Sequence, residues 1–206
     1  MQQHFRKNII VLFVLLIPVS AVVSQISIPK PDATTNTENT KAKWISWAIF
    51  QALPVPVYTE DAGESDSRLQ FGLRWNVTPI NISFNANKYV SDVQFFMVNP
   101  VRRFTGSIEL FVQPEWATAG FKNADLNRFG LGIGSRIFVP VKNYGETFAA
   151  SIGAKYTFRG SEMSEKNGYL GFEGGIYALY GIFGLQLNYN LDERSRYNVG
   201  LYFKFF

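Results

Sequence analysis

Apolar residues alternate with polar or very small residues from about residue 45 to the C-terminus, in segments of about ten residues. This period of two is typical of a β-strand that has two different faces. The clearest example is segment 68–77, where one face carries Leu69, Phe71, Leu73, Trp75 and Val77 and the other carries Arg68, Gln70, Gly72, Arg74 and Asn76. The same rule predicts further strands at 80–86, 103–113, 128–139, 146–159, 169–178, 183–191 and 197–205. The pattern predicts an all-β protein.

Short and long connections alternate between these segments. The predicted short turns are Thr78–Pro79, Asn99–Pro100, 141–145 and 179–181, and the predicted polar loops are 59–67, 114–127, 159–167 and 192–196. With segments 45–57 and 92–98 added, the prediction is ten antiparallel strands. Because Pro54 and Pro56 cannot donate hydrogen bonds to a ladder, eight strands remain the alternative.

The composition of the polar faces indicates whether the polar or the apolar side of the predicted sheet points outward. They are rich in glycine and amide residues, and the glycines at 130, 132 and 134 leave room for bulky side chains opposite. The apolar faces carry Trp75, Tyr156, Tyr189 and Tyr197 near strand ends, and such aromatic residues favour a membrane interface. A closed barrel also satisfies every backbone hydrogen bond without water. We therefore predict an antiparallel transmembrane β-barrel over residues 44–206, with a soluble exported ligand-binding barrel as the alternative.

The N-terminus has the order of a secretory signal peptide. Arg6 and Lys7 precede the apolar run 8–17, and small residues close the segment at Ser20, Ala21 and Ser24. A retained membrane anchor is the alternative, but the run is shorter than the ~20 residues that a spanning helix needs. We predict a signal peptide at 1–24 and, because 25–43 is rich in Thr, Asn and Pro, a flexible periplasmic tail at 25–43.

The composition of the chain excludes several classes of function. The net charge of +4 falls to +2 without Arg6 and Lys7, which gives no support to a nucleic-acid partner. The chain has no cysteine, so disulfides, thiolate metal sites and a cysteine nucleophile are excluded. The single histidine, His4, lies in the predicted signal peptide, so the mature chain would lack an imidazole for general-base or metal chemistry. We expect neither enzymatic activity nor a cofactor.

Six charged residues fall on the predicted polar face: Arg74, Glu109, Arg136, Lys155, Glu173 and Lys204. A narrow barrel is filled by its own side chains, and buried charges need partners, so these residues predict a structural network inside the barrel. The alternative is a constriction with a slight excess of cations that favours small anions. Glu109 and Glu173 could also form an acid/base pair, because paired carboxylates can exchange protons.

The end of the chain, Tyr197 to Phe206, resembles the C-terminal strand of small outer-membrane β-barrel proteins of Gram-negative bacteria. The shared features are the alternating Tyr197, Val199, Leu201, Phe203 and Phe205 and the terminal aromatic Phe206. The alternation ends on Phe205 rather than Phe206, and Lys204 stands where the family usually has an apolar residue. The resemblance identifies a class and no subfamily. It implies an outer-membrane location, contact with outer-membrane lipid, and recognition by the barrel-assembly machinery during insertion.

The resemblance leaves three functional hypotheses. The first is a non-enzymatic barrel with a structural or surface-contact role through its outer loops. The second is a narrow pore or transport component for small solutes, and the third is the soluble ligand-binding barrel. Outer-membrane lipases, lipid A-modifying enzymes and proteases use histidine, which the predicted mature chain lacks.

Overall fold

The computed structural model describes residues 37–64, 66–84, 92–96, 105–145, 147–161 and 167–204, all within the compact unit Asp32–Phe206. In these ranges the helix α2 (Thr37–Gln51) precedes ten strands. The strands are β1 (Val55–Ala62), β2 (Ser67–Arg74), β3 (Val77–Ser83), β4 (Val93–Phe95), β5 (Ser107–Ala117), β6 (Phe129–Lys142), β7 (Phe148–Phe158), β8 (Gly168–Ala178), β9 (Phe183–Asn190) and β10 (Tyr197–Phe203). Two short 3-10 helices, η1 (Asn143–Gly145) and η2 (Glu193–Ser195), lie in connections.

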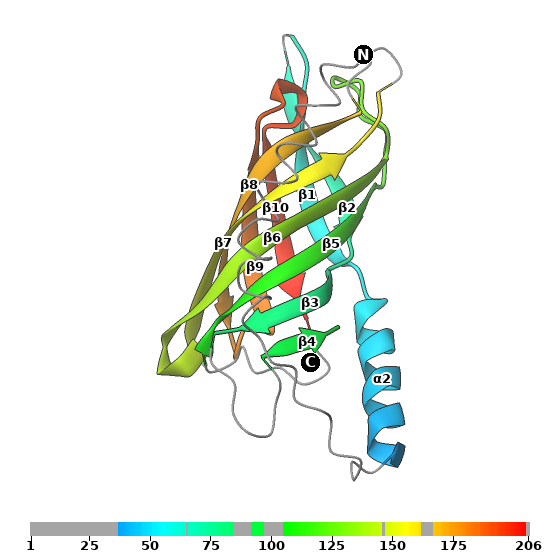
Figure 1. The fold of residues 1–206 in the computed structure, drawn as a ribbon. Helices are drawn as coiled ribbons and strands as arrows, with labels where there is room; N and C mark the ends of the chain where they lie inside the picture. The colour runs from blue at the N-terminus through cyan, green and yellow to red at the C-terminus, as the bar shows by residue number, and fades with distance from the viewer. Residues whose placement is uncertain are drawn as a thin grey trace, which may run out of the picture. The chain divides into compact units, whose positions relative to one another are not determined.

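Eight of these strands close into an antiparallel barrel (Figure 1). Around the ring the order is β2-β1-β10-β9-β8-β7-β6-β5, and the ring closes where Gly72, Leu73 and Arg74 of β2 pair with Ala117, Trp116 and Glu115 of β5. Strands β3 and β4 lie outside the ring, with β3 paired to β5 and β4 paired to β3. The predicted all-β antiparallel barrel is confirmed, and its closed ring has the smaller of the two strand numbers that the sequence allowed.

The predicted turn at Thr78–Pro79 is wrong. Both residues lie inside β3, and β2 and β3 run one after the other along β5 without reversing direction. The register with β5 shifts between Val77 and Ile80, which marks a bulge. A bulge is one of the few places in a sheet that tolerates proline, so Pro79 interrupts the ladder without turning the chain.

The strand predicted at 45–57 is also wrong over most of its length. Residues up to Gln51 belong to α2, and β1 begins only at Val55. Helix α2 also covers residues 37–43, where the sequence predicted a flexible tail. Ile45, Ala48, Ile49 and Ala52 repeat at the helical spacing i, i+3, i+4, i+7, and this period outweighs the short stretch of alternation.

Several strands extend into segments that were predicted to be loops. Strand β1 continues to Ala62, β5 continues to Ala117, and β6 continues to Lys142. The predicted connections at 179–181, 192–196 and 159–167 do lie between strands. The predicted signal peptide 1–24, the turn Asn99–Pro100 and the aromatic residues Phe205 and Phe206 lie outside the described residues.

The two faces of the barrel differ sharply in chemistry. The side chain of Arg74 is fully buried inside, whereas Ile152 on the outer face is 71% exposed. Other large apolar side chains of the ring with exposed outer positions are Leu69, Phe71, Phe129, Ile133, Ile137, Phe172, Ile176, Leu187 and Leu201. The predicted period of two is therefore confirmed. Among the described residues, no helix is long and apolar enough to cross a membrane.

Four aromatic or small apolar residues form a cluster inside one part of the barrel: Phe138, Ala149, Tyr177 and Tyr202. The ring of Tyr177 lies 5.1 Å from that of Phe138 and 5.0 Å from that of Tyr202, measured between centroids. Glycines on neighbouring strands make room for bulky interior groups. A Cβ atom on Gly134, for example, would lie 2.7 Å from Cζ of Phe111. The interior is thus a packed core of polar and aromatic side chains.

Candidate functional site

Glu115 is the centre of one half of the charged interior. Arg74 donates from Nε to Oε1 of Glu115 at 2.9 Å, and Lys155 donates from Nζ to the same oxygen at 3.2 Å. Arg159 donates from Nη2 to Oε2 at 3.0 Å. These three cations come from β2, β7 and the residue directly after β7, so closure of the barrel is what brings them to one carboxylate. We call Glu115 and its three cations the Glu115 cluster.

Arg136 is the centre of a second group with the opposite arrangement. Its Nε donates to Oε2 of Glu109 and its Nη1 donates to Oε1 of Glu173, each at 2.8 Å. The guanidinium carbon also lies 4.8 Å from the ring centroid of Phe111 and 5.1 Å from that of Tyr202. One cation is therefore held by two carboxylates and two aromatic faces, and all five side chains are buried. We call these residues the Arg136 cluster.

Two glutamine side chains connect the clusters. Gln113 accepts from Nζ of Lys155 at 3.3 Å and donates to Oε2 of Glu173 at 3.3 Å. Gln186 donates to Oε1 of Glu173 at 3.3 Å and accepts from Nη1 of Arg74 at 3.5 Å. The charged interior is therefore one continuous network, because each glutamine touches a member of both clusters.

In the described part of the chain, buried cations outnumber buried carboxylates by one. The buried cations are Arg74, Arg136, Lys155, Arg159 and Lys204, and the buried carboxylates are Asp61, Glu109, Glu115 and Glu173. Each of the three glutamates is bound by at least one arginine, and such charge-assisted hydrogen bonds are among the strongest in proteins. Since Arg136 binds both Glu109 and Glu173, this geometry favours a structural role for the two carboxylates over an acid/base pair. In the described part of the chain, no group of three or more His, Cys, Asp or Glu residues could hold a metal ion.

The structure places the six sequence-predicted residues of the charge network in the interior. Arg74, Glu109, Arg136, Lys155 and Glu173 form ion pairs there, and Lys204 is buried at the end of β10. Sequence reasoning missed Glu115 as a member because it placed residues 114–127 in a loop. The signal was present, since Glu115 has the same parity in the strand as Glu109 and Gln113.

Of the predicted C-terminal assembly signal, Tyr197, Val199, Leu201 and Phe203 lie in β10, and none of them is buried. They share the outer face of this strand, and Asn198, Gly200 and Tyr202 between them are buried. The remaining two members, Phe205 and Phe206, lie outside the described residues.

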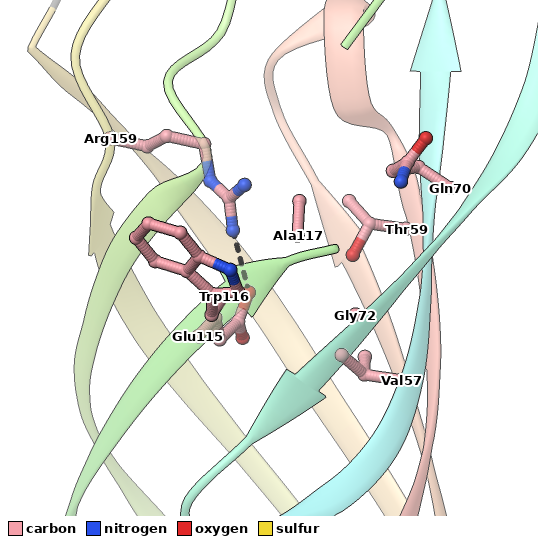
Figure 2. A pocket seen from close by; sticks show the side chains of 8 residues that line it. All are labelled: Val57, Thr59, Gln70, Gly72, Glu115, Trp116, Ala117 and Arg159. Atoms are coloured by element: carbon pink, nitrogen blue, oxygen red, sulfur yellow. Dashed lines mark hydrogen bonds and ion pairs between the residues drawn. The ribbon is translucent and has the colours of Figure 1, made fainter. Parts of the chain in front are cut away.

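A small pocket adjoins the Glu115 cluster (Figure 2). It encloses about 170 Å³, including space open to solvent, and is lined by Val57, Thr59, Gln70, Gly72, Glu115, Trp116, Ala117 and Arg159. Figure 2 shows the Arg159 guanidinium reaching across to the Glu115 carboxylate at its edge. Ligand pockets typically measure ~300–1,000 Å³, so this pocket is too small for an ordinary organic ligand.

The connections at the end of the barrel nearest Glu115 are tied to one another. Asp61 at the end of β1 accepts hydrogen bonds from the backbone N–H groups of Lys122, Asn123 and Ala124 and from Nε of Arg68. These contacts fix the connection between β5 and β6 against the turn between β1 and β2. We call this end of the barrel, with connections 63–66, 118–128, 159–167 and 191–196, the loop end.

The other connections of the loop end join the same arrangement. Asn127 donates its backbone N–H to the carbonyl of Gly160, and Arg194 donates from Nη1 to the carbonyl of Asp125. Arg194 also pairs with Asp192 at 2.7 Å, and its hydrogen bond to that carboxylate raises the pKa of Arg194. All four connections therefore share hydrogen bonds with a neighbouring connection or strand end.

Fold and interior together define a class: a closed eight-stranded antiparallel β-barrel with a network of charged side chains buried inside and large apolar side chains exposed outside. The chain matches no protein-family model, no curated protein and no solved structure.

Proposed function

We propose that this chain is a non-enzymatic integral outer-membrane β-barrel protein that makes surface contacts through its loop end. The observation that carries the proposal is the inverted placement of side chains. Four arginine and lysine residues and three glutamates form a buried network, while the outer face exposes leucine, isoleucine and phenylalanine. A soluble barrel has the opposite arrangement, whereas a membrane barrel pairs an apolar outer band with a polar interior.

The lengths of the hairpin connections support an orientation for the barrel. At the end opposite the loop end, the hairpin connections 143–147 and 179–182 are short; β1 also begins there, and the longer stretch 84–106, which contains β4, joins β3 to β5 at this end. Outer-membrane barrels have short turns on the periplasmic side and longer loops outside the cell. In our proposal the loop end faces the exterior, and α2 lies on the periplasmic side.

Surface contact suits the loop end because hydrogen bonds hold described residues of its connections, such as Lys122, Asn123 and Asn127, before any partner binds. A pre-organised surface loses less conformational entropy on binding than a flexible one. The interior then acts as the rigid support, since its network joins β2, β5, β7, β8 and β9. The absence of cysteine from the sequence and of histidine beyond His4 supports a non-enzymatic role.

Fractionation of Gram-negative cells that express the full chain tests this proposal. We expect the protein in the outer membrane, with a gel mobility in SDS that differs between boiled and unboiled samples, because a closed barrel resists SDS until heated. A soluble periplasmic product with one mobility would contradict the proposal and favour the exported ligand-binding barrel.

The narrow-pore hypothesis makes a different prediction for planar bilayers. An open path is not expected, because the network fills the interior and the pocket beside it encloses only about 170 Å³. We expect no conductance steps from the wild-type protein. Steps that change on Arg74→Gln or Arg136→Gln substitution would replace the structural role with a transport role.

A further inference from the structure

The C-terminal half of α2 and the residues directly after it expose an apolar surface. Ile45, Ile49 and Leu53 are 61%, 60% and 50% exposed, and Ala48 between them is exposed as well. Ile45, Ala48 and Ile49 lie on one side of the helix, because residues three and four positions apart share a face. We call Ile45, Ala48, Ile49 and Leu53 the α2 surface. Isoleucine and leucine side chains exposed together in this way indicate a contact with an apolar phase or partner.

Contacts of Phe50 and Ala52 connect this part of the chain with the outer face of the barrel. The ring of Phe50 lies 6.4 Å from that of Phe203 in β10, measured between centroids, with an edge-to-face geometry. Trp75, directly after β2, donates from Nε1 to the carbonyl of Ala52 at 3.0 Å. Phe203 and Trp75 both lie at odd-numbered positions, which in β2 and β10 are the positions of the apolar outer face. The end of α2 and the residue after it are therefore held against the surface that the proposed function assigns to lipid.

The sequence of α2 changes character along its length. Residues 37–43 are polar and contain Lys41 and Lys43, and residues 44–50 are apolar except for Ser46. Trp44 stands at the boundary, where its ring makes an edge-to-face contact with Phe96 at 5.9 Å. Lysine and tryptophan at such a boundary are typical of a segment at the surface of a bilayer, where amines meet lipid phosphates and apolar side chains enter the acyl region.

We infer that the apolar half of α2 inserts into the periplasmic leaflet beside the barrel. The α2 surface is then covered by phospholipid rather than by protein. This inference rests on the proposed function. The lipid is favoured over a second copy or another protein because Phe50 and Ala52 contact the outer apolar band, and because two lysines precede the apolar half of the helix. The helix would then anchor the rim of the barrel where β1 begins.

Quenching of single tryptophan residues by brominated lipid tests the inference. The test variant keeps Trp44 and carries Trp47→Phe, Trp75→Phe and Trp116→Phe. The matched control keeps Trp116 on the outer face of β5 and carries Trp44→Phe, Trp47→Phe and Trp75→Phe. Both full-length variants are folded into vesicles of phosphatidylcholine and phosphatidylglycerol, with or without bromine on the acyl chains. We expect brominated lipid to reduce the emission of both.

Trp44 and Trp116 together distinguish a failure of the inference about α2 from a failure of the proposed membrane function. If Trp116 is quenched and Trp44 is not, the barrel is in the membrane and the inference about α2 is overturned. If neither is quenched, the proposed membrane function fails as well. Unchanged heat-modifiability of each variant shows that the barrel has folded.

Charge introduced into the α2 surface gives a second test. The double variant Ile45→Asp, Ile49→Asp in the Trp44-only chain is expected to lose quenching of Trp44, because carboxylates are costly in the acyl region. The apolar control Ile45→Val, Ile49→Val is expected to keep it. Equal quenching of Trp44 in the two double variants would show that lipid does not contact this surface, and would overturn the inference.

Discussion

The two clusters inside the barrel both compensate buried charges, but their central residues have opposite charges. In the Glu115 cluster one carboxylate is shared by Arg74, Lys155 and Arg159, whereas in the Arg136 cluster one guanidinium is shared by Glu109 and Glu173. The Arg136 cluster also has aromatic faces and two glutamine donors around it, while the Glu115 cluster depends on its single anion. We therefore expect the cost of a substitution to increase with the number of opposite charges that the replaced residue alone compensates.

The largest effect is expected for Glu115→Ala. The substitution leaves three cations close together with no carboxylate between them, and breaking a buried pair typically costs about 3–5 kcal/mol. We expect a loss of this size in the free energy of unfolding by urea in detergent micelles. Glu115→Gln keeps the shape of the side chain and one hydrogen-bond acceptor. If the negative charge is decisive, this variant should lose almost as much free energy of unfolding as Glu115→Ala. A loss below about 1 kcal/mol for both variants would remove Glu115 from the centre of the network.

Arg136→Met should rank second. Glu109 and Glu173 lose their shared cation, but Glu173 keeps the donors of Gln113 and Gln186, so we expect a loss of about 3 kcal/mol in the same urea unfolding measurement. A larger loss than that of Glu115→Ala would invert the comparison. It would then indicate that the contacts of Arg136 with Phe111 and Tyr202 contribute more than its charge.

Glycine substitutions test the packing around both clusters. A Cβ atom at Gly134 would collide with the carbonyl of Ala154 and lie 2.7 Å from Cβ of Lys155, so Gly134→Ala should destabilise the barrel by about 1–3 kcal/mol. Gly174 is the matched control, because a Cβ atom there meets nothing within 4 Å. Gly174→Ala should leave the midpoint of urea unfolding unchanged or slightly higher. Equal losses at both positions would show that the close packing of the interior does not govern stability.

The smallest effect is expected outside the network. Glu193 in η2 forms an ion pair with Arg196 at 3.5 Å, but its side chain is 89% exposed. Exposed pairs are screened by water and salt, so Glu193→Ala should change the free energy of unfolding by no more than about 0.5 kcal/mol. A loss comparable to that of Arg136→Met would show that burial is not what separates the interior from the loop end.

Much of this interior could be predicted from the sequence because the period of two is local. Segments 128–139 and 146–159 alternate so regularly that Arg136 and Lys155 could be assigned to the polar face without knowledge of the strand order. The strand order itself could not be predicted in full. Whether β2 and β3 turn back or continue along β5 depends on a bulge between Val77 and Ile80, which the sequence around Pro79 does not distinguish from a turn.

The two remaining errors have different physical causes. Glu115 was hidden because Pro114 directly before it is typical of a strand end or a loop, although β5 tolerates this proline and keeps Glu115 inside. Helix α2 was missed because a short apolar stretch such as 44–50 fits either a strand or a helix. The contacts of Trp44 with Phe96 and of Phe50 with Phe203 join this stretch to residues distant in the sequence, and a local pattern does not reveal such contacts.

Cysteine labelling in intact cells can show whether the loop end of a membrane-inserted barrel faces the exterior, because the chain has no cysteine of its own. Lys122→Cys places a thiol on an exposed connection of the loop end, and Lys142→Cys places one at the exposed opposite end of β6. In Gram-negative cells that express each variant, a membrane-impermeant maleimide should label Cys at position 122 in intact cells and at position 142 only after lysis. Labelling of both positions only after lysis, with the protein in the soluble fraction, would contradict the account.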